Sequence, residues 1–207
     1  DIVYLEHSIM GEGEEMIKEL NLVKPALIIV DVQNDFCPGG ALPVPNGDEV
    51  VAPLNKMIRL FVKNNMLIFA SRDWHPESTT HFNTCGGPWP PHCIQHTRGA
   101  EFHKDLELRL YTVIVSKGMG DEENAYSDFD GFAVYPNYSP DSEWEEKDHP
   151  TLEQFLGEND IHTLYVGGLA TDYCVKATVL DALKLGFKVY LLEDACRASG
   201  QELRPEA

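Results

Sequence analysis

Three residues along the 207-residue chain could together activate a sulfur nucleophile. Cys174 follows an apolar run and two glycines and precedes a stretch with helical periodicity, which places it in the first turn of a helix. Unpaired N–H groups and the positive dipole end there favour a thiolate, although a lone cysteine near a helix start is more often a small buried apolar residue. Asp31 could take the thiol proton, and Lys117 could keep that carboxylate ionised.

An aspartate and several histidines could hold a metal ion. Asp73 and His75 stand two residues apart in a predicted extended loop, where alternate side chains point the same way and both can face one cation. His81 and His92 follow within the next turn-rich stretch. Imidazole and carboxylate ligands suit zinc or iron. We therefore expect an open site of Asp73, His75 and His92, with His81 as an optional fourth ligand.

The same stretch also contains two cysteines, which permit a different metal site. Two thiolates and two imidazoles make closed structural zinc sites. Here these ligands would be Cys85, Cys93, His81 and His92. The open site is favoured because Asp73 and His75 follow the end of a predicted strand.

The elements that would position these residues alternate along the chain. Apolar runs predict strands at 26–30, 66–70, 111–115, 162–166 and 187–192. Helical spacing and caps predict helices at 48–63, 151–156 and from 172 to Gly186. The alternation indicates a three-layer α/β fold with a mostly parallel, doubly wound, Rossmann-like sheet. The catalytic candidates and Asp73 each follow a different strand at its carboxyl end, the edge where such sheets bind ligands.

Composition narrows the class of partner. Acidic residues outnumber basic ones 34 to 16, a balance that repels polyphosphate and so argues against nucleic acid or an anionic membrane. A neutral or cationic small molecule suits it better. No apolar run is long enough to cross a membrane, and the first two dozen residues lack the order of a secretion signal or transit peptide. Five cysteines, an odd number, indicate reduced thiols, so we expect a cytoplasmic protein.

Two segments lie outside the regular alternation. Residues 1–24 are charged and predict an N-terminal extension, and residues 25–207 predict one α/β domain, which is either short or truncated at its C-terminus because a further helix would be expected there. Residues 119–150 form a long acidic connection in which ten carboxylates face one lysine. We expect a solvated loop that serves as a lid, insertion or interface.

Five segments together resemble the isochorismatase-like cysteine hydrolases, and within them the nicotinamidases. They are Asp31–Phe36 (DVQNDF), Arg72–His75 (RDWH), Trp89–Cys93 (WPPHC), Ser116–Gly118 (SKG) and Gly168–Val175 (GLATDYCV). They stand in family order and the resemblance covers roughly residues 25–199. It implies an Asp31, Lys117 and Cys174 triad that hydrolyses nicotinamide, and also pyrazinamide, in NAD salvage.

The same resemblance implies further roles. One divalent metal ion, zinc or iron, would bind Asp73, His75 and His92, with His81 at a position that is a ligand in some members, and would hold the pyridine nitrogen. The ring pocket would be lined by Phe36, Trp89 and Tyr173. Backbone N–H groups of Ala170 and Cys174 would form the oxyanion hole, beside a cis peptide between Leu169 and Ala170. A homo-oligomer is also expected.

The expected reaction begins when Asp31 deprotonates Cys174 and the thiolate attacks the carboxamide. Asp31 then returns the proton to departing ammonia, and water cleaves the thioester. The nearest rival is a metal-free relative that uses the same triad on isochorismate or an N-carbamoyl compound. The metal ligands and aromatic residues argue against it, and an acidic protein repels dianionic isochorismate. A catalytically silent binding protein is the remaining alternative.

Overall fold

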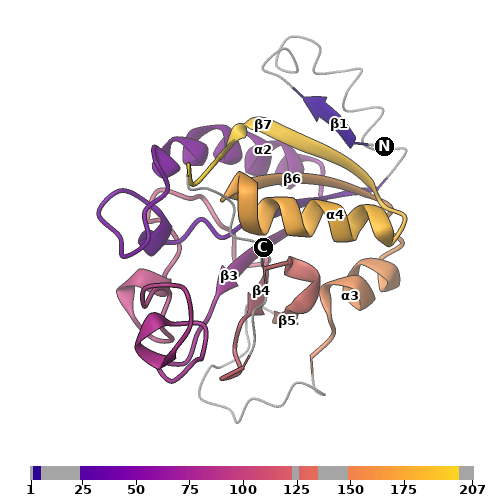
Figure 1. Ribbon diagram of the computed structural model, residues 1–207. Helices are drawn as coiled ribbons and strands as arrows, with labels where there is room; N and C mark the ends of the chain where they lie inside the picture. The colour runs from indigo at the N-terminus through magenta and orange to yellow at the C-terminus, as the bar shows by residue number, and fades with distance from the viewer. Residues whose placement is uncertain (1, 6–23, 123–125, 135–148, 201–207) are drawn as a thin grey trace.

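The computed structural model describes residues 2–5, 24–122, 126–134 and 149–200. Strands in these residues form a seven-stranded sheet in the order β1-β7-β6-β2-β3-β4-β5, with β5 antiparallel to β4 and the other neighbours parallel (Figure 1). The strands are β1 (Ile2–Leu5), β2 (Pro25–Val30), β3 (Leu67–Asp73), β4 (Val113–Lys117), β5 (Phe132–Val134), β6 (Thr163–Leu169) and β7 (Lys188–Arg197). The expected mostly parallel α/β fold is confirmed.

Helices cover both faces of this sheet. Helix α2 (Val51–Lys63) lies on one face, and α3 (Leu152–Glu158) and α4 (Lys176–Lys184) lie on the other (Figure 1). Side chains of β2 alternate between the two cores: Leu27 and Ile29 pack with α2, whereas Ile28 and Val30 pack with α3 and α4. Because β2 is buried on both faces, it reads as a continuous apolar run. Among the described residues, no helix has the length and apolar character needed to cross a membrane.

Several elements differ from the sequence-based expectation. Strand β4 begins two residues later than predicted and β7 continues to Arg197. The short strand β5 was not predicted, because three residues give no detectable period. Strand β1, within the expected extension, pairs with β7 at the sheet edge.

The two glycines before Cys174, Gly167 and Gly168, lie inside β6. Gly168 pairs with Val30 of β2 and has φ +135°, where L side chains are strained. A β-carbon at this position would collide with the Val30 carbonyl oxygen. The glycine therefore allows β6 to lie close against β2 directly before the loop that carries Cys174.

Candidate active site

The four strand-end residues predicted from the sequence meet at one edge of the sheet. Asp31 follows β2, Asp73 ends β3 and Lys117 ends β4, where it is paired in register with Asp73. The Lys117 ammonium donates to Asp31 Oδ2 at 2.6 Å and to Asp73 Oδ1, and its Nζ lies 3.7 Å from Cys174 Sγ. An ammonium has three N–H donors, so each donor of Lys117 has a partner here.

Asp31 is held by both its backbone and its side chain. It has φ +47°, a left-handed conformation that aspartate adopts more readily than most residues. In this conformation its N–H donates to Ser71 Oγ at 3.2 Å, and the Ser71 hydroxyl donates to Asp31 Oδ1 at 2.8 Å. Ser71 lies on β3 and is fully buried. One carboxylate oxygen is thus fixed by Ser71 and the other by Lys117.

Cys174 lies in a π-helical turn, Thr171–Val175, that precedes α4. The Val175 N–H donates to the Ala170 carbonyl at 3.2 Å, the wide spacing of such turns, which are common at functional sites. Burial raises the pKa of the Cys174 thiol well above its ordinary value, although Lys117 acts in the opposite direction. The expectation that the helix start favours a thiolate is therefore outweighed, and the resting residue is a thiol.

The neighbouring carboxylate is a suitable proton acceptor for this thiol. Burial raises the pKa of Asp31, and the opposing effect of Lys117 does not overcome it. The Cys174 sulfur and a carboxylate oxygen of Asp31 lie within 4.8 Å of each other. Burial alone would lower the pKa of Lys117, but Asp31 and Asp73 raise it well above the ordinary value, so the ammonium is permanent. The site thus holds a thiol, a base of increased proton affinity and a fixed positive charge.

Two histidines next to Asp73 are oriented as metal ligands. His75 Nδ1 lies 2.9 Å from the Gly118 carbonyl and His92 Nδ1 lies 2.7 Å from the Pro90 carbonyl. Since a carbonyl only accepts, each Nδ1 carries the proton and each Nε2 presents a lone pair. The two Nε2 atoms lie 3.6 Å and 3.8 Å from Asp73 Oδ2.

The donor set of this cluster fits a divalent cation. His75 Nε2 is buried and has no hydrogen-bond partner among the described residues. The ligand atoms of His75, His81 and His92 all lie within 4.8 Å of one another. Burial acts to raise the pKa of Asp73, but Lys117 and the histidines hold it well below the usual range, so the carboxylate is charged. Three imidazoles and a carboxylate are ligands that zinc and iron accept.

The alternative closed zinc site is not formed. In the described part of the chain, His81 and His92 group with His75, a second group joins Asp31, Asp73 and Cys174, and neither group includes Cys85 or Cys93. Cys85 is exposed and its sulfur lies 4.0 Å from the Glu77 carbonyl. The sequence alone could not show which way the two thiols face.

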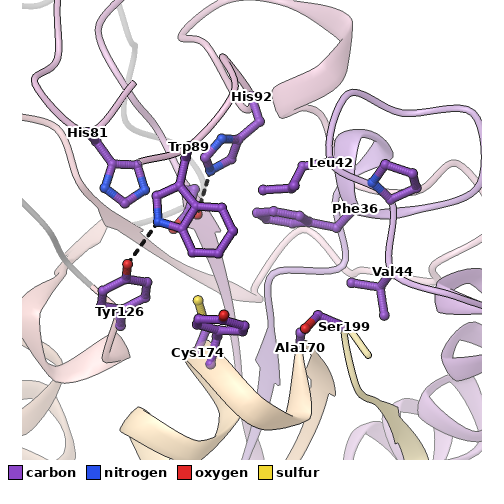
Figure 2. Close-up of a pocket in the computed structure, with 13 residues that line it drawn as sticks. Phe36, Leu42, Val44, His81, Trp89, His92, Tyr126, Ala170, Cys174 and Ser199 are labelled. Atoms are coloured by element: carbon purple, nitrogen blue, oxygen red, sulfur yellow. Dashed lines mark hydrogen bonds and ion pairs between the residues drawn. The ribbon is translucent and has the colours of Figure 1, made fainter. Parts of the chain in front are cut away.

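A largely apolar pocket separates the histidines from the cysteine. In Figure 2, His81 and His92 lie on one side of this pocket and Cys174 on the opposite side, with aromatic rings between them. The Trp89 and Tyr173 rings meet edge to face, with centroids 5.2 Å apart. The pocket is lined by Phe36, Leu42, Pro43, Val44, Asp73, His81, Trp89, His92, Tyr126, Ala170, Tyr173, Cys174 and Ser199. The aromatic residues expected from the resemblance are all present in it.

Several lining residues were missed by the sequence interpretation. Tyr126 belongs to the acidic connection, yet its hydroxyl accepts the Trp89 Nε1–H at 2.9 Å and its ring lines the pocket (Figure 2). The indication that the sequence offered for Tyr126 was an aromatic side chain within an otherwise acidic segment. Ser199 follows β7, and its N–H and hydroxyl donate to the Asp172 carboxylate at 2.8 Å and 2.5 Å. No periodic pattern could have placed Ser199 at the pocket.

The acidic connection also departs from the expected solvated loop. Asp128, in a short 3-10 turn between β4 and β5, is completely buried. Burial and the neighbouring Asp31 carboxylate raise its pKa well above the ordinary value. The rest of this connection, residues 123–125 and 135–148, lies outside the described residues.

The Leu169–Ala170 peptide bond is cis, as the resemblance implied.

The fold and the site define an α/β protein that gathers a thiol, a carboxylate and an ammonium at the carboxyl edge of a mostly parallel sheet. A family model for the isochorismatase domain matches residues 25–130 and 142–207. The chain therefore belongs to the isochorismatase family.

Similar proteins within this family carry more specific names. The nicotinamidase of Escherichia coli is 37% identical over 196 residues, which are 87% of this chain and 85% of that protein. The crystal structure of the pyrazinamidase of Pyrococcus horikoshii in complex with zinc has a TM-score of 0.73 and 45% identity, covering 88% of this chain and 89% of the other. A protein of L. infantum in complex with nicotinate has a TM-score of 0.70 and 33% identity, covering 86% and 83%.

Proposed function

We propose that this chain is a metal-dependent nicotinamidase that hydrolyses nicotinamide to nicotinate and ammonia. The chain is a hydrolase of the isochorismatase family that acts on an amide C–N bond. The observation that carries the proposal is the position of Cys174, Asp31 and Lys117 across an aromatic pocket from three histidines. A flat heteroaromatic amide fits this arrangement, because its ring can lie between aromatic side chains while its amide faces the sulfur.

In the proposed reaction, Asp31 takes the proton of the Cys174 thiol as the sulfur attacks the amide carbon and forms a C–S bond. The raised pKa of Asp31 supports this role. The C–N bond then breaks, and Asp31 returns the proton to the nitrogen, which leaves as ammonia. Water attacks the resulting thioester and gives its proton to Asp31. The C–S bond breaks, nicotinate is released, and Asp31 returns this proton to the sulfur, which regenerates the thiol.

Lys117 and the backbone would stabilise charge during these steps. The Lys117 ammonium lies next to both the sulfur and Asp31, so it stabilises whichever of them is negative. We propose that the N–H groups of Ala170 and Cys174 bind the oxyanion. Residues Asp73, His75 and His92, with His81, would hold a divalent ion. Such an ion, when bound, supplies a Lewis acid that accepts the pyridine nitrogen and orients the ring.

Several finer features of the proposal rest on composition and on the relatives. We propose zinc as the metal, with iron as the alternative, and pyrazinamide as a second substrate. We also propose that residues 25–207 form the hydrolase domain, that the chain acts in NAD salvage in the cytoplasm, and that it forms a homo-oligomer. The acidic composition remains the reason for expecting a small molecule as the partner, without nucleic acid or a membrane.

An ammonia-release assay tests the proposal against its nearest rival, a metal-free amidase of the same family. Purified protein would be compared on nicotinamide, pyrazinamide and an N-carbamoyl amino acid, with Cys174→Ala as the inactive control. We expect nicotinamide turnover that falls on chelation and returns with added zinc or iron. Turnover of the N-carbamoyl compound alone, at a rate that chelation does not change, would favour the rival.

A further inference from the structure

Asp128 is a buried acid for which the proposed reaction has no use. Its side chain is 0% exposed, in the turn Asp128–Asp130 packed against β4, α3 and α4. Its backbone N–H donates to Thr178 Oγ1 of α4 at 3.0 Å, which fixes the main chain. Neither of its carboxyl oxygens has a hydrogen-bond partner among the described residues. A buried carboxylate without donors is costly, so the protonation state of Asp128 needs an explanation.

The nearby donors are all committed to other groups. The three N–H groups of Lys117 serve Asp31, Asp73 and Cys174. Ser71 lies near enough to interact with the Asp128 carboxyl, but its single proton goes to Asp31 Oδ1 at 2.8 Å. An ionised Asp128 would therefore lack any donor and would add a negative charge beside Asp31.

A protonated Asp128 resolves both problems. The Ser71 oxygen has two lone pairs, and one already accepts the Asp31 N–H at 3.2 Å. The other can accept an O–H from Asp128. Each hydrogen-bonding position of Ser71 is then filled by Asp31 or Asp128.

We propose that Asp128 is a positioning residue. It is a neutral carboxylic acid that donates a hydrogen bond to Ser71 and so completes a hydrogen-bond chain from Asp128 through Ser71 to the Asp31 carboxylate. This series of hydrogen bonds holds Asp31 Oδ1 in place, which leaves Oδ2 for Lys117. Its catalytic consequence rests on the proposed function, because Asp31 is the proton acceptor there. Without its proton, Asp128 could only accept a hydrogen bond from Ser71, and its negative charge would repel the Asp31 carboxylate.

The groups that act on Asp128 come from several elements. Asp31 and Asp73, at the ends of β2 and β3, oppose its ionisation, and Lys117 of β4 favours it. From α4, the uncharged Thr178 contacts its backbone and Asp181 interacts with the preceding Ser127. Burial is the largest influence, and the balance raises the pKa of Asp128 well above its ordinary value.

The protonation state can be tested by stability, independently of activity. The folded pKa is raised, so the unfolded chain loses this proton at lower pH than the folded chain, and wild-type stability falls as pH rises through that window. Asparagine does not titrate. We therefore expect the unfolding constant of wild type, divided by that of Asp128→Asn, to rise by up to about tenfold per pH unit above pH ~4. Urea unfolding from pH 4 to 8 measures this ratio.

Glu158→Gln is the control, because it makes the same carboxylate-to-amide change at an exposed position, the last residue of α3. We expect its ratio to stay within about threefold over the same range, since exposed carboxyls titrate similarly in both states. A flat ratio for Asp128→Asn, matching the control, would overturn the proposal by showing that Asp128 is ionised. This readout stands even if the protein does not hydrolyse nicotinamide.

The positioning role is tested by kinetics. Asn can still donate to Ser71, so Asp128→Asn should keep kcat within about threefold of wild type, whereas isosteric Asp128→Leu should lower kcat about tenfold with unchanged KM. If the Leu variant does not fold, Ser71→Ala breaks the same chain and should give the same loss. Equal kcat for the Asn variant and for the folded variant that breaks the chain would overturn the positioning role. An absence of ammonia release from wild type would instead overturn the proposed function and leave the stability result intact.

Discussion

The site has two sides that differ in how completely their own residues satisfy one another. On the sheet side, Asp31, Lys117 and Cys174 stand at strand ends, and every N–H of Lys117 has a partner. On the loop side, defined by His75, His81 and His92, the ligand nitrogens of the three imidazoles lie within 4.8 Å of one another. His75 Nε2 has no hydrogen-bond partner in the described residues. The sheet side pairs its own charges, whereas the loop side presents lone pairs that a divalent cation would fill.

This difference predicts that the two sides have different roles, the sheet side in the chemical step and the loop side in binding. A complete set of acid, base and nucleophile can carry out bond making and breaking, so we expect changes on the sheet side to lower kcat. A set of lone pairs facing a pocket binds and orients, so we expect changes on the loop side to raise KM. Asp73 belongs to both sides, because one oxygen accepts from Lys117 and the other faces the histidine Nε2 atoms.

The largest expected effect is that of Cys174→Ala. Removing the proposed nucleophile should lower kcat for ammonia release by at least about 10⁴-fold, because no other described thiol lies in the pocket. The ring contacts and the loop side are untouched, so nicotinate binding measured by calorimetry should stay within about threefold of wild type. Residual turnover at a tenth of the wild-type rate would show that the sulfur is not the nucleophile.

Lys117→Met should damage both chemistry and stability. It leaves Asp31 and Asp73 close together without the buried ammonium, and breaking such a set typically costs about 3–5 kcal/mol. We expect kcat to fall by at least about 10³-fold and the urea midpoint to fall with it. Lys104→Met, which removes an exposed ammonium paired with Asp105, is the control and should change neither. An unchanged urea midpoint for Lys117→Met would contradict the paired burial of Lys117.

His92→Ala should act mainly through binding. It removes one lone pair from the loop side, so we expect metal content to fall and KM for nicotinamide to rise about 10–100-fold. Elemental analysis and steady-state kinetics measure the two effects. The exposed His96 lies outside the cluster, and His96→Ala should change neither quantity. A pure loss of kcat with normal metal content in the His92 variant would break the proposed division between the two sides.

The same contrast governs what the sequence could predict. The sheet side follows from general rules, because the continuous apolar run ending at Val30 places Asp31 at a strand end and parallel strands bring such ends together. Lys117 was found in the same way although β4 begins later than expected. The pKa of Cys174 was wrongly expected to be low, since a local helix-dipole argument cannot include burial by distant elements.

The loop side had no such rule. His75 and His92 were placed as ligands by spacing and resemblance, while the orientation of Cys85 depended on loop geometry that has no period. The sequence did not identify Tyr126 as a pocket residue or Asp128 as a buried residue, because the charge of their segment predicted exposure to solvent. The burial of Asp128 results from packing of the turn Asp128–Asp130 against α4 and the sheet, which is a tertiary effect.

The smallest predicted effect concerns the Trp89–Tyr126 hydrogen bond, which joins the loop that carries His81 and His92 to the acidic connection. Tyr126→Phe keeps the ring but removes the acceptor of the Trp89 Nε1–H. Since Trp89 is buried, losing this acceptor should cost about 1–3 kcal/mol of stability and raise KM about fivefold, with kcat unchanged. The matched control is Tyr111→Phe, because Tyr111 is 52% exposed and lies outside the pocket.

The Tyr126 variant also separates positioning from chemistry on the loop side. Tyr126 makes no hydrogen bond to Asp31 or Lys117 in the described structure. A rise in KM with unchanged kcat would therefore mean that Tyr126 and Trp89 only hold the substrate ring. A fall in kcat equal to the rise in KM would mean that the tilt of the ring sets the approach of the amide carbon to Cys174. In that case the loop side would share in the chemical step, and the division between the two sides would no longer hold.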